Sequence, residues 1–163
     1  MKVKGFTLIE LVVVIVILGI LAVTAAPKFL NLQGDARKSS LKGLESAIRG
    51  GASLVYGKAA IQNIERNELD TIEGDINIAY GYPTISVNDG IGKAVDGLGG
   101  VDDDWSTVEV TADLPPRLVI GFKIPDNETP TVSDIVTTRC YLIYTEARDK
   151  DDPFDVTLDV TDC

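Results

Sequence analysis

The pattern of hydrophobic positions changes along the chain. Residues 6–26 are apolar except for Thr7, Glu10 and Thr24. As a helix, this run would be about 31 Å long at 1.5 Å per residue, which matches a bilayer core of roughly 30 Å. Farther along, apolar residues recur every three or four positions, as in a helix with one buried face. The two patterns predict one long helix over residues 6–61. Its second half would be half-buried, with one apolar face made of these residues: Leu41, Leu44, Ile48, Ala52, Val55 and Ala59.

Beyond residue 63, polar and Gly-rich stretches separate short runs of β-branched and aromatic residues. The strongest strand predictions are residues 117–124 and 135–145. Residues 154–160 alternate apolar and polar positions, as a half-buried strand does, and a further strand is predicted near residues 107–110. We predict a connecting region at residues 76–87 and a Gly-rich loop at residues 91–100. Three or four antiparallel strands packed on the helix would make an α+β domain.

Several residues inside the predicted helix disfavour helical structure. Pro27 removes a backbone hydrogen bond and clashes with the preceding turn, at a cost of about 3 kcal/mol. Each glycine inside a helix costs about 1 kcal/mol relative to alanine, and the run holds several of them, including Gly34, Gly50 and Gly51. We therefore expect a kink at Pro27, or local melting between residues 24 and 34. Close packing against another helix is the alternative reason for the glycines.

A carboxylate, Glu10, stands near the start of the apolar run. An acidic group inside a bilayer is costly and needs a cationic partner, so Glu10 predicts a functional role. Lys2 and Lys4 come before the run, and the positive-inside rule places that end of the chain in the cytoplasm. A secretory signal peptide or a plain membrane anchor would share the apolar run. Neither explains Glu10, and Pro27 directly follows the position at which a signal peptide would be cut.

Charge divides the 163 residues into two parts. Residues 1–62 hold eight Lys or Arg and three Asp or Glu, a net charge of +5, whereas residues 63–163 hold seven and 22, a net charge of −15. The acidic part argues against nucleic-acid binding, which needs Lys and Arg. The acids either keep the domain soluble or complement basic surfaces of packed subunits. The chain has no histidine, which excludes Ser-His-Asp and Cys-His enzymes and His-containing zinc sites.

The two cysteines, Cys140 and Cys163, lie in the part predicted to be exported. An even count in an oxidising compartment predicts one disulfide, and two free thiols are the alternative. The bridge would close a 24-residue loop worth about 3 to 3.5 kcal/mol. An oxygen-rich turn nearby has a composition that can hold Ca²⁺, but its order does not match an EF-hand loop. We expect a solvated loop without metal at these residues: Asp149, Asp151, Asp152 and Asp155.

The segment Gly5-Phe6-Thr7-Leu8-Ile9-Glu10, with a short basic leader before it and a long apolar helix after it, resembles the start of the type IV pilins. The resemblance implies that a prepilin peptidase cuts between Gly5 and Phe6 and methylates the new amino group of Phe6. It also implies that Glu10 pairs with the Phe6 amine of a neighbouring subunit during assembly. The alternative is that Glu10 meets the amine of its own chain one turn away, or favours the positive N-terminus of its own helix. Pro27 falls where the family has a helix-disturbing proline, and the cysteine pair resembles the disulfide loop of the family.

The resemblance implies the type IV pilin fold, which is α+β with a long N-terminal helix and an antiparallel sheet. The expected parts are a leader (residues 1–5), a transmembrane and assembly helix (6–27), an amphipathic stalk helix (28–62) and a globular head (63–163). The subunit would sit in the bacterial inner membrane, meet the inner-membrane assembly machinery, and then join an extracellular homopolymer. We predict a major pilin, a structural subunit that is not an enzyme and needs no cofactor.

Three short segments resemble the mannose-sensitive haemagglutinin branch of the type IVa pilins: residues 25–33, residues 55–59 and Asp103-Asp104-Trp105. That resemblance implies surface adhesion and biofilm attachment. Two alternatives remain open. Type II secretion pseudopilins share the N-terminal motif, and a membrane-tethered enzyme or binding domain would need only a borrowed leader.

Overall fold

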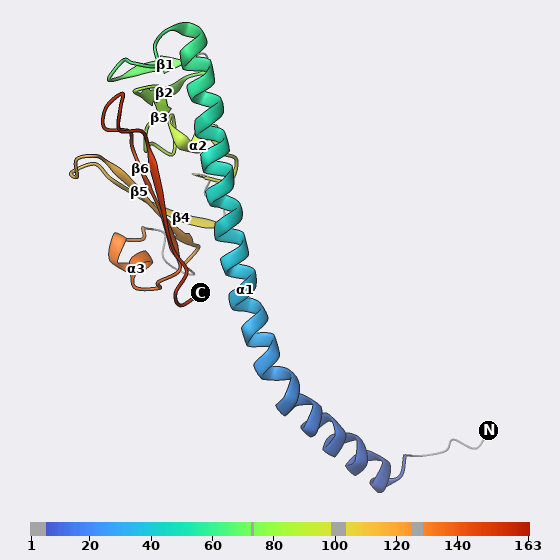
Figure 1. Cartoon of the computed structure of the whole chain (residues 1–163). Coiled ribbons are helices and arrows are strands. Elements are labelled where there is room, and N and C mark those ends of the chain that lie inside the picture. Colours follow the sequence, from blue (N-terminus) through green and yellow to red (C-terminus); the bar gives the residue numbers. More distant parts are fainter. Residues whose placement is uncertain (1–5, 73, 99–103, 125–128) are drawn as a thin grey trace. The chain divides into compact units, whose positions relative to one another are not determined.

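The computed structural model describes residues 6–72, 74–98, 104–124 and 129–163, with the backbone alone for residues 26–31. Contacts divide the chain into two compact units, Met1–Ala36 and Arg37–Cys163. The elements follow the order α1-β1-β2-β3-α2-β4-β5-α3-β6-β7. The strands form two antiparallel sheets, both in the second unit (Figure 1).

Helix α1, Leu8–Gln62, has 55 residues and agrees closely with the helix predicted over residues 6–61. It ends because Asn63 takes a left-handed conformation with φ of 59°, the backbone geometry of many helix C-termini. Residues 24–34 are helical, Pro27 included. The kink at Pro27 remains a prediction. The local melting also remains a prediction, and it concerns the subunit in the assembled filament.

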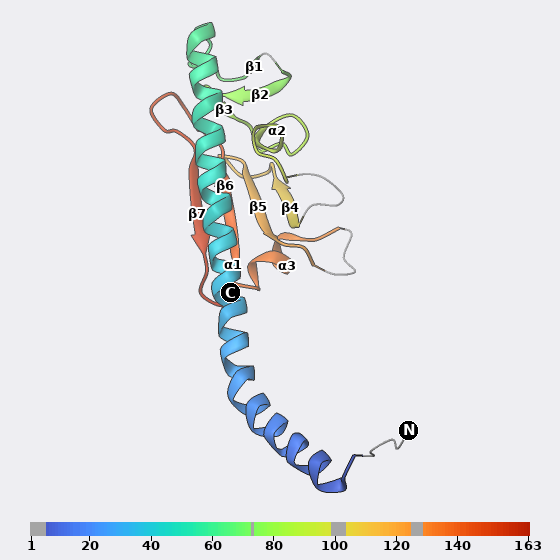
Figure 2. The ribbon, with the colours of Figure 1, turned by 90° about the vertical axis from the view of Figure 1, so that its right-hand side faces the viewer.

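The larger sheet is a four-stranded antiparallel meander in the order β4-β5-β6-β7. Its strands are β4 (Trp105–Val110), β5 (Arg117–Phe122), β6 (Tyr141–Thr145) and β7 (Asp155–Asp159). One pair of cross-strand partners, Trp105 and Phe122, marks one end of the sheet, and Val110 and Arg117 mark the other. Figure 2 shows the strands side by side next to the C-terminal part of α1.

The strand predicted over residues 135–145 is wrong in its first half. Helix α3, Val132–Val136, ends there, a turn follows over residues 137–139, and β6 begins only at Tyr141. Thr131 caps α3 by accepting a hydrogen bond from the backbone N–H of Asp134, and Arg139 turns the chain at a φ of 50°. The local cap overrides the strand propensity of the valine and isoleucine residues in this segment.

A smaller three-stranded sheet in the order β1-β2-β3 covers the C-terminal end of α1. It consists of β1 (Asp70–Ile72), β2 (Ile76–Ala79) and β3 (Tyr82–Pro83), and α2 (Ile91–Ala94) follows it. Val55 and Ala59 of α1 pack against the buried isoleucines of β1 and β2. The sequence predicted only a connecting region here, because strands of two to four residues are too short to show a periodic pattern.

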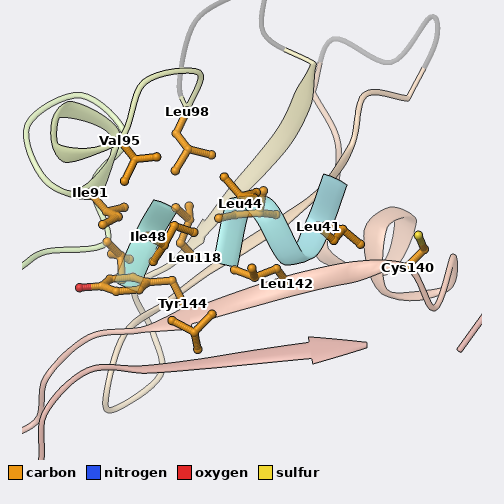
Figure 3. Close-up of a cluster of buried hydrophobic side chains, with 13 residues drawn as sticks. Leu41, Leu44, Ile48, Ile91, Val95, Leu98, Leu118, Cys140, Leu142 and Tyr144 are labelled. Carbon is orange, nitrogen blue, oxygen red and sulfur yellow. The ribbon is translucent and has the colours of Figure 1, made fainter. Parts of the chain in front are cut away.

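The main core lies between α1 and the larger sheet. Leu41, Leu44 and Ile48 of α1 lie in one cluster with Leu118, Leu142 and Tyr144 of the sheet (Figure 3). The α2 region covers the same cluster with Ile91, Val95 and Leu98. All six residues predicted to form the apolar face of the helix are at most 7% exposed, so the periodicity located the core-facing side of the helix correctly.

Three side chains in or next to the larger sheet form hydrogen bonds with alternate residues of the segment 83–87. The Tyr144 hydroxyl donates to the Pro83 carbonyl at 2.6 Å, and the Ile85 N–H donates to Glu146 Oε2 at 2.9 Å. The Val87 N–H donates to Glu109 Oε1 at 2.8 Å. Side chains thus supply these three bonds, and the backbone adds one from the Thr84 N–H to the Asn77 carbonyl of β2 at 3.0 Å. Burial raises the pKa of Glu146, and its bond from Ile85 lowers that pKa by a smaller amount.

The raised pKa of Glu146 predicts a pH dependence of folding. The folded state binds this proton more tightly than the unfolded state, so the contribution of Glu146 to stability rises as pH falls from neutrality toward about 4.5. Glu146→Gln keeps an acceptor for Ile85 and should remove that rise. Glu146→Ala leaves the Ile85 N–H unpaired and should cost about 1 to 2 kcal/mol. Urea unfolding followed by fluorescence of Trp105 measures both effects.

The difference between wild type and Glu146→Gln isolates this residue from other titrating groups. Asp70 and Asp159 have pKa values lowered by hydrogen bonds, so their contributions are lost only in stronger acid, below the range in question. An unchanged slope of stability against pH in the Gln variant would show that Glu146 is not the cause.

Candidate assembly site at the start of the apolar helix

Thr7 and Glu10 begin helix α1 with a reciprocal capping box. The Thr7 backbone N–H and the Thr7 hydroxyl both donate to Glu10 Oε2, each at 2.8 Å. The Glu10 N–H in turn donates to the Thr7 hydroxyl at 3.3 Å. This Thr-x-x-Glu arrangement satisfies two N–H groups that a helix N-terminus otherwise leaves unpaired. It explains why the helix begins at Leu8.

The segment Leu8–Ala25 is long and apolar enough to cross a membrane. Its mean hydropathy is 3.0, and none of it is buried within the subunit. Large side chains such as Ile9, Ile15 and Leu21 are more than half exposed. A surface of this size does not stay in water, because removing apolar area from water is favourable by about 25 cal/mol per Å². The segment therefore needs lipid or another protein surface around it.

Glu10 faces an apolar setting on this segment. It lines a shallow, open hollow together with Phe6, Ile9, Val13 and Val14, and it is the one polar residue of that lining. Phe6 is 90% exposed. A carboxylate among apolar groups attracts a cation strongly once water is excluded. The arrangement can thus bind an ammonium group presented by a second molecule.

The other predicted site residues lie in different places. Gly5 is outside the described residues, so the structure does not describe the predicted cleavage site. Cys140 and Cys163 form the predicted disulfide, with 4.9 Å between their Cα atoms. This bridge lies in the second unit, which also holds the sheets, and it has no part in the capping box.

The acidic turn before β7 is held by hydrogen bonds within the turn. Asp149 accepts from the N–H groups of Asp151 and Asp152, at 2.7 and 3.0 Å, and Lys150 pairs with Asp151. Asp155 begins β7. Within the described ranges, no group of three or more His, Cys, Asp or Glu side chains is placed to hold a metal ion. The turn is exposed, and its description as a solvated loop stays a prediction.

A row of small residues follows the exposed face of α1, opposite the core. They recur at alternating steps of four and three: Ser39, Gly43, Ser46, Gly50, Ser53, Gly57 and Ala60. A Cβ atom added at Gly43, Gly50 or Gly57 would meet nothing within 4 Å. Gly51, by contrast, lies against α2, where an added Cβ would come within 2.8 Å of the Ala94 carbonyl oxygen. The three exposed glycines together cost about 3 kcal/mol of helix stability, and among the described residues no contact requires them.

Two serines of this small-residue row already have their hydroxyls paired. Ser46 donates to the Lys42 carbonyl at 2.9 Å, and Ser53 donates to the Arg49 carbonyl at 2.7 Å. Such back-bonding to the preceding turn lets serine enter an apolar interface without an unsatisfied polar group. The face is therefore suited to close contact with another helix.

Sequence reasoning missed Thr7 as a site residue and missed the regularity of the small-residue row. The signal for Thr7 was available in the Thr-x-x-Glu spacing directly before an apolar run. Close helix packing is one expected reason for the glycines, but that expectation does not use their seven-residue spacing, Gly43 to Gly50 to Gly57, which indicates a single face of the helix.

Comparison with known proteins identifies the class of fold. Residues 1–26 match the prokaryotic N-terminal methylation motif. With that motif, a long apolar helix followed by an antiparallel sheet is the α+β type IV pilin fold. The fold class predicted from the sequence is confirmed.

One curated relative is informative. Over 62 residues the chain is 43% identical to a protein of Thermus thermophilus described as the type IV narrow pilus major component PilA5. The aligned part covers 38% of this chain and 50% of the relative, so the chain spans about half the length of the curated relative that it matches. No solved structure matches the chain.

Proposed function

We propose that this protein is the major structural subunit of a bacterial type IV pilus and polymerises through its N-terminal helix. The observation that carries the proposal is Glu10, a carboxylate held at the start of an exposed, membrane-length apolar helix. The methylation motif and the similarity to a narrow-pilus component support the same function. A structural role requires no catalytic group.

The chemistry of assembly follows from the proposed processing. Cleavage between Gly5 and Phe6 creates an α-amino group on Phe6, which is cationic at neutral pH. Glu10 of an incoming subunit pairs with that amine on its neighbour, and the pair sets the register of two otherwise featureless apolar helices. A polar pair that fixes register in an apolar interface is a well-attested device. The partners are thus a prepilin peptidase, the inner-membrane assembly machinery and further copies of the chain.

The small-residue row extends the interface beyond the membrane segment. Apolar helices approach each other closely where one of them carries glycine, alanine or serine. In a filament, the exposed apolar segment of one subunit is buried against such faces of its neighbours. The three short segments that resemble the mannose-sensitive haemagglutinin branch support a type IVa pilus used for surface adhesion and biofilm attachment.

Replacing Glu10 tests the proposal. In a host that carries the assembly machinery, Glu10→Ala should leave leader cleavage and membrane insertion intact and abolish surface filaments, because the register-setting pair is lost. Sheared filaments are quantified against the processed subunit in the membrane fraction. Mass spectrometry of wild-type filaments should find this chain as the main component, beginning at N-methylated Phe6.

Glu68→Ala is the matched control, since Glu68 is an exposed acid of the head, and this variant should assemble normally. Normal piliation by Glu10→Ala would contradict the proposal. So would wild-type filaments in which this chain is absent or only a trace component.

A further inference from the structure

We propose that Thr7 is a positioning residue for assembly, because its hydroxyl holds Glu10 in the orientation that receives the cation of a second copy. This inference rests on the proposed function and adds to it a residue that neither the methylation motif nor the similarity assigns. Thr7 would orient the Glu10 carboxylate before the amine of the second copy arrives.

The hydrogen bonds use only one of the two carboxylate oxygens. Both bonds from Thr7 end on Glu10 Oε2. In the part of the chain that the structure describes, Oε1 accepts no hydrogen bond, and the side chain borders the apolar hollow beside Phe6. The capping box therefore fixes one oxygen and leaves the other available to an incoming ammonium group.

This arrangement lowers the free-energy cost of placing Glu10 in the membrane. A carboxylate without donors inside an apolar medium is strongly unfavourable. The two donors of Thr7 supply hydrogen bonds to Glu10 within the same chain before its partner arrives. They also restrict the rotamers of Glu10, so that less side-chain conformational entropy is lost when Glu10 pairs with the amine.

The head contains the same motif in a different setting. Thr131 and Asp134 form a capping box at the start of α3, with the Thr131 N–H and hydroxyl both 2.8 Å from Asp134 Oδ2. Those residues are exposed on the head, where water can replace the bonds. Thr131 thus provides a control in the same molecule, because removing its hydroxyl breaks the same contact without affecting Glu10.

The test compares four variants of the full chain in the assembling host. Thr7→Val keeps the branched shape and loses the hydroxyl, and we expect about a ten-fold or greater drop in filament yield per processed membrane subunit, the size of losing a hydrogen bond to a charged group. Thr7→Ser restores the hydroxyl and should assemble close to wild type. Thr131→Val should assemble normally.

The fourth variant, Thr7→Gly, separates orientation from helix capping. Glycine caps a helix N-terminus nearly as well as threonine, but it cannot donate a side-chain hydrogen bond. If Thr7 only begins the helix, Thr7→Gly should assemble like wild type, and that result would overturn the inference. If Thr7 orients Glu10, Thr7→Gly should fail to the same degree as Thr7→Val.

Cleavage and membrane insertion are measured in every variant, so that filament yield is always compared at equal amounts of processed subunit. Normal yield from Thr7→Val would refute the positioning role while Glu10→Ala still abolishes filaments, and the proposed function would then stand. Normal filament yield from Glu10→Ala would contradict both the proposed function and the positioning role of Thr7.

Discussion

The substitution Gly50→Leu is expected to prevent filament assembly and to leave the subunit folded. Gly50 lies on the exposed face of α1, where an added Cβ would meet nothing within 4 Å. A leucine there replaces a poor helix former with a good one, so the subunit should gain up to about 1 kcal/mol of stability. The same side chain would stand between this helix and any neighbour that packs against the small-residue row, and the helices could no longer approach closely.

The measurement pairs two readouts on one variant. Urea unfolding followed by Trp105 fluorescence reports the stability of the head, because Trp105 packs on Phe122 with ring centroids 4.9 Å apart. Sheared filaments report assembly. Gly50→Ala should stabilise the subunit by a similar amount and should reduce assembly less, since a methyl group separates the helices by less than an isobutyl group does.

Two controls define the interpretation. Ala47→Leu adds comparable bulk to an exposed position of α1 outside the small-residue row, and we expect it to assemble. Gly51→Ala lies against α2 and should instead destabilise the head, because its Cβ would lie 2.8 Å from the Ala94 carbonyl oxygen. Wild-type filament yield from Gly50→Leu would show that the exposed glycines do not face another helix.

The long helix could be predicted from the sequence because its signals are dense and regular. An unbroken apolar run and a repeat of three and four residues over Leu41 to Ala59 leave few other structures possible. The glycines and Pro27 weaken the local preference for helix, yet the structure keeps the helix through all of them. Burial of one face, and not intrinsic propensity, stabilises most helices in proteins.

The head was harder to predict, because short elements carry little periodic information. Residues such as Ile135 and Val136 favour strands by propensity, but the capping box at Thr131 begins a helix there. Only Pro83 of the segment 83–87 belongs to a strand, and the segment is held by Tyr144, Glu146 and Glu109, which are far away in the sequence. Contacts between residues so far apart in sequence cannot be inferred from local pattern.

The candidate site shows a similar division. Glu10 and Phe6 could be chosen from the sequence, since a charge in an apolar run is conspicuous and the resemblance gave both residues a role. The role of Thr7 follows only from the structure, in which both of its donors reach the same oxygen of Glu10. Likewise, only the structure distinguishes Gly50, which faces open space, from its neighbour Gly51, which faces α2.

Removal of the disulfide is expected to lower the free energy of unfolding of the head by about 3 kcal/mol. The bridge between Cys140 and Cys163 closes a loop of 24 residues, and the chain-entropy model gives this magnitude for such a loop. The loop contains β6 and β7. Strand β7 is at the edge of its sheet, with β6 on one side and one hydrogen bond from Arg49 to the Val156 carbonyl on the other.

Loss of the bridge should therefore loosen β7 first. Cys140 is only 3% exposed and packs in the main core with Leu41 and Leu142, so replacement by serine would bury a hydroxyl. The double substitution Cys140→Ala with Cys163→Ala avoids that complication, and reduction of the wild-type bridge gives an independent comparison. Urea unfolding of the detergent-solubilised chain, followed by fluorescence of Trp105, measures both, because this tryptophan is the only one in the chain.

Arg139→Ala serves as the control next to the bridge. It removes the exposed ion pair between Arg139 and Asp162, whose charged atoms lie 3.3 Å apart, and an exposed pair of this kind contributes less than about 1 kcal/mol. A head that unfolds at the same urea concentration with and without the bridge would contradict the prediction. In that case β7 would be held by its pairing with β6, its core contacts through Val156 and the hydrogen bond from Arg49, and the bridge would add little to the stability of the head.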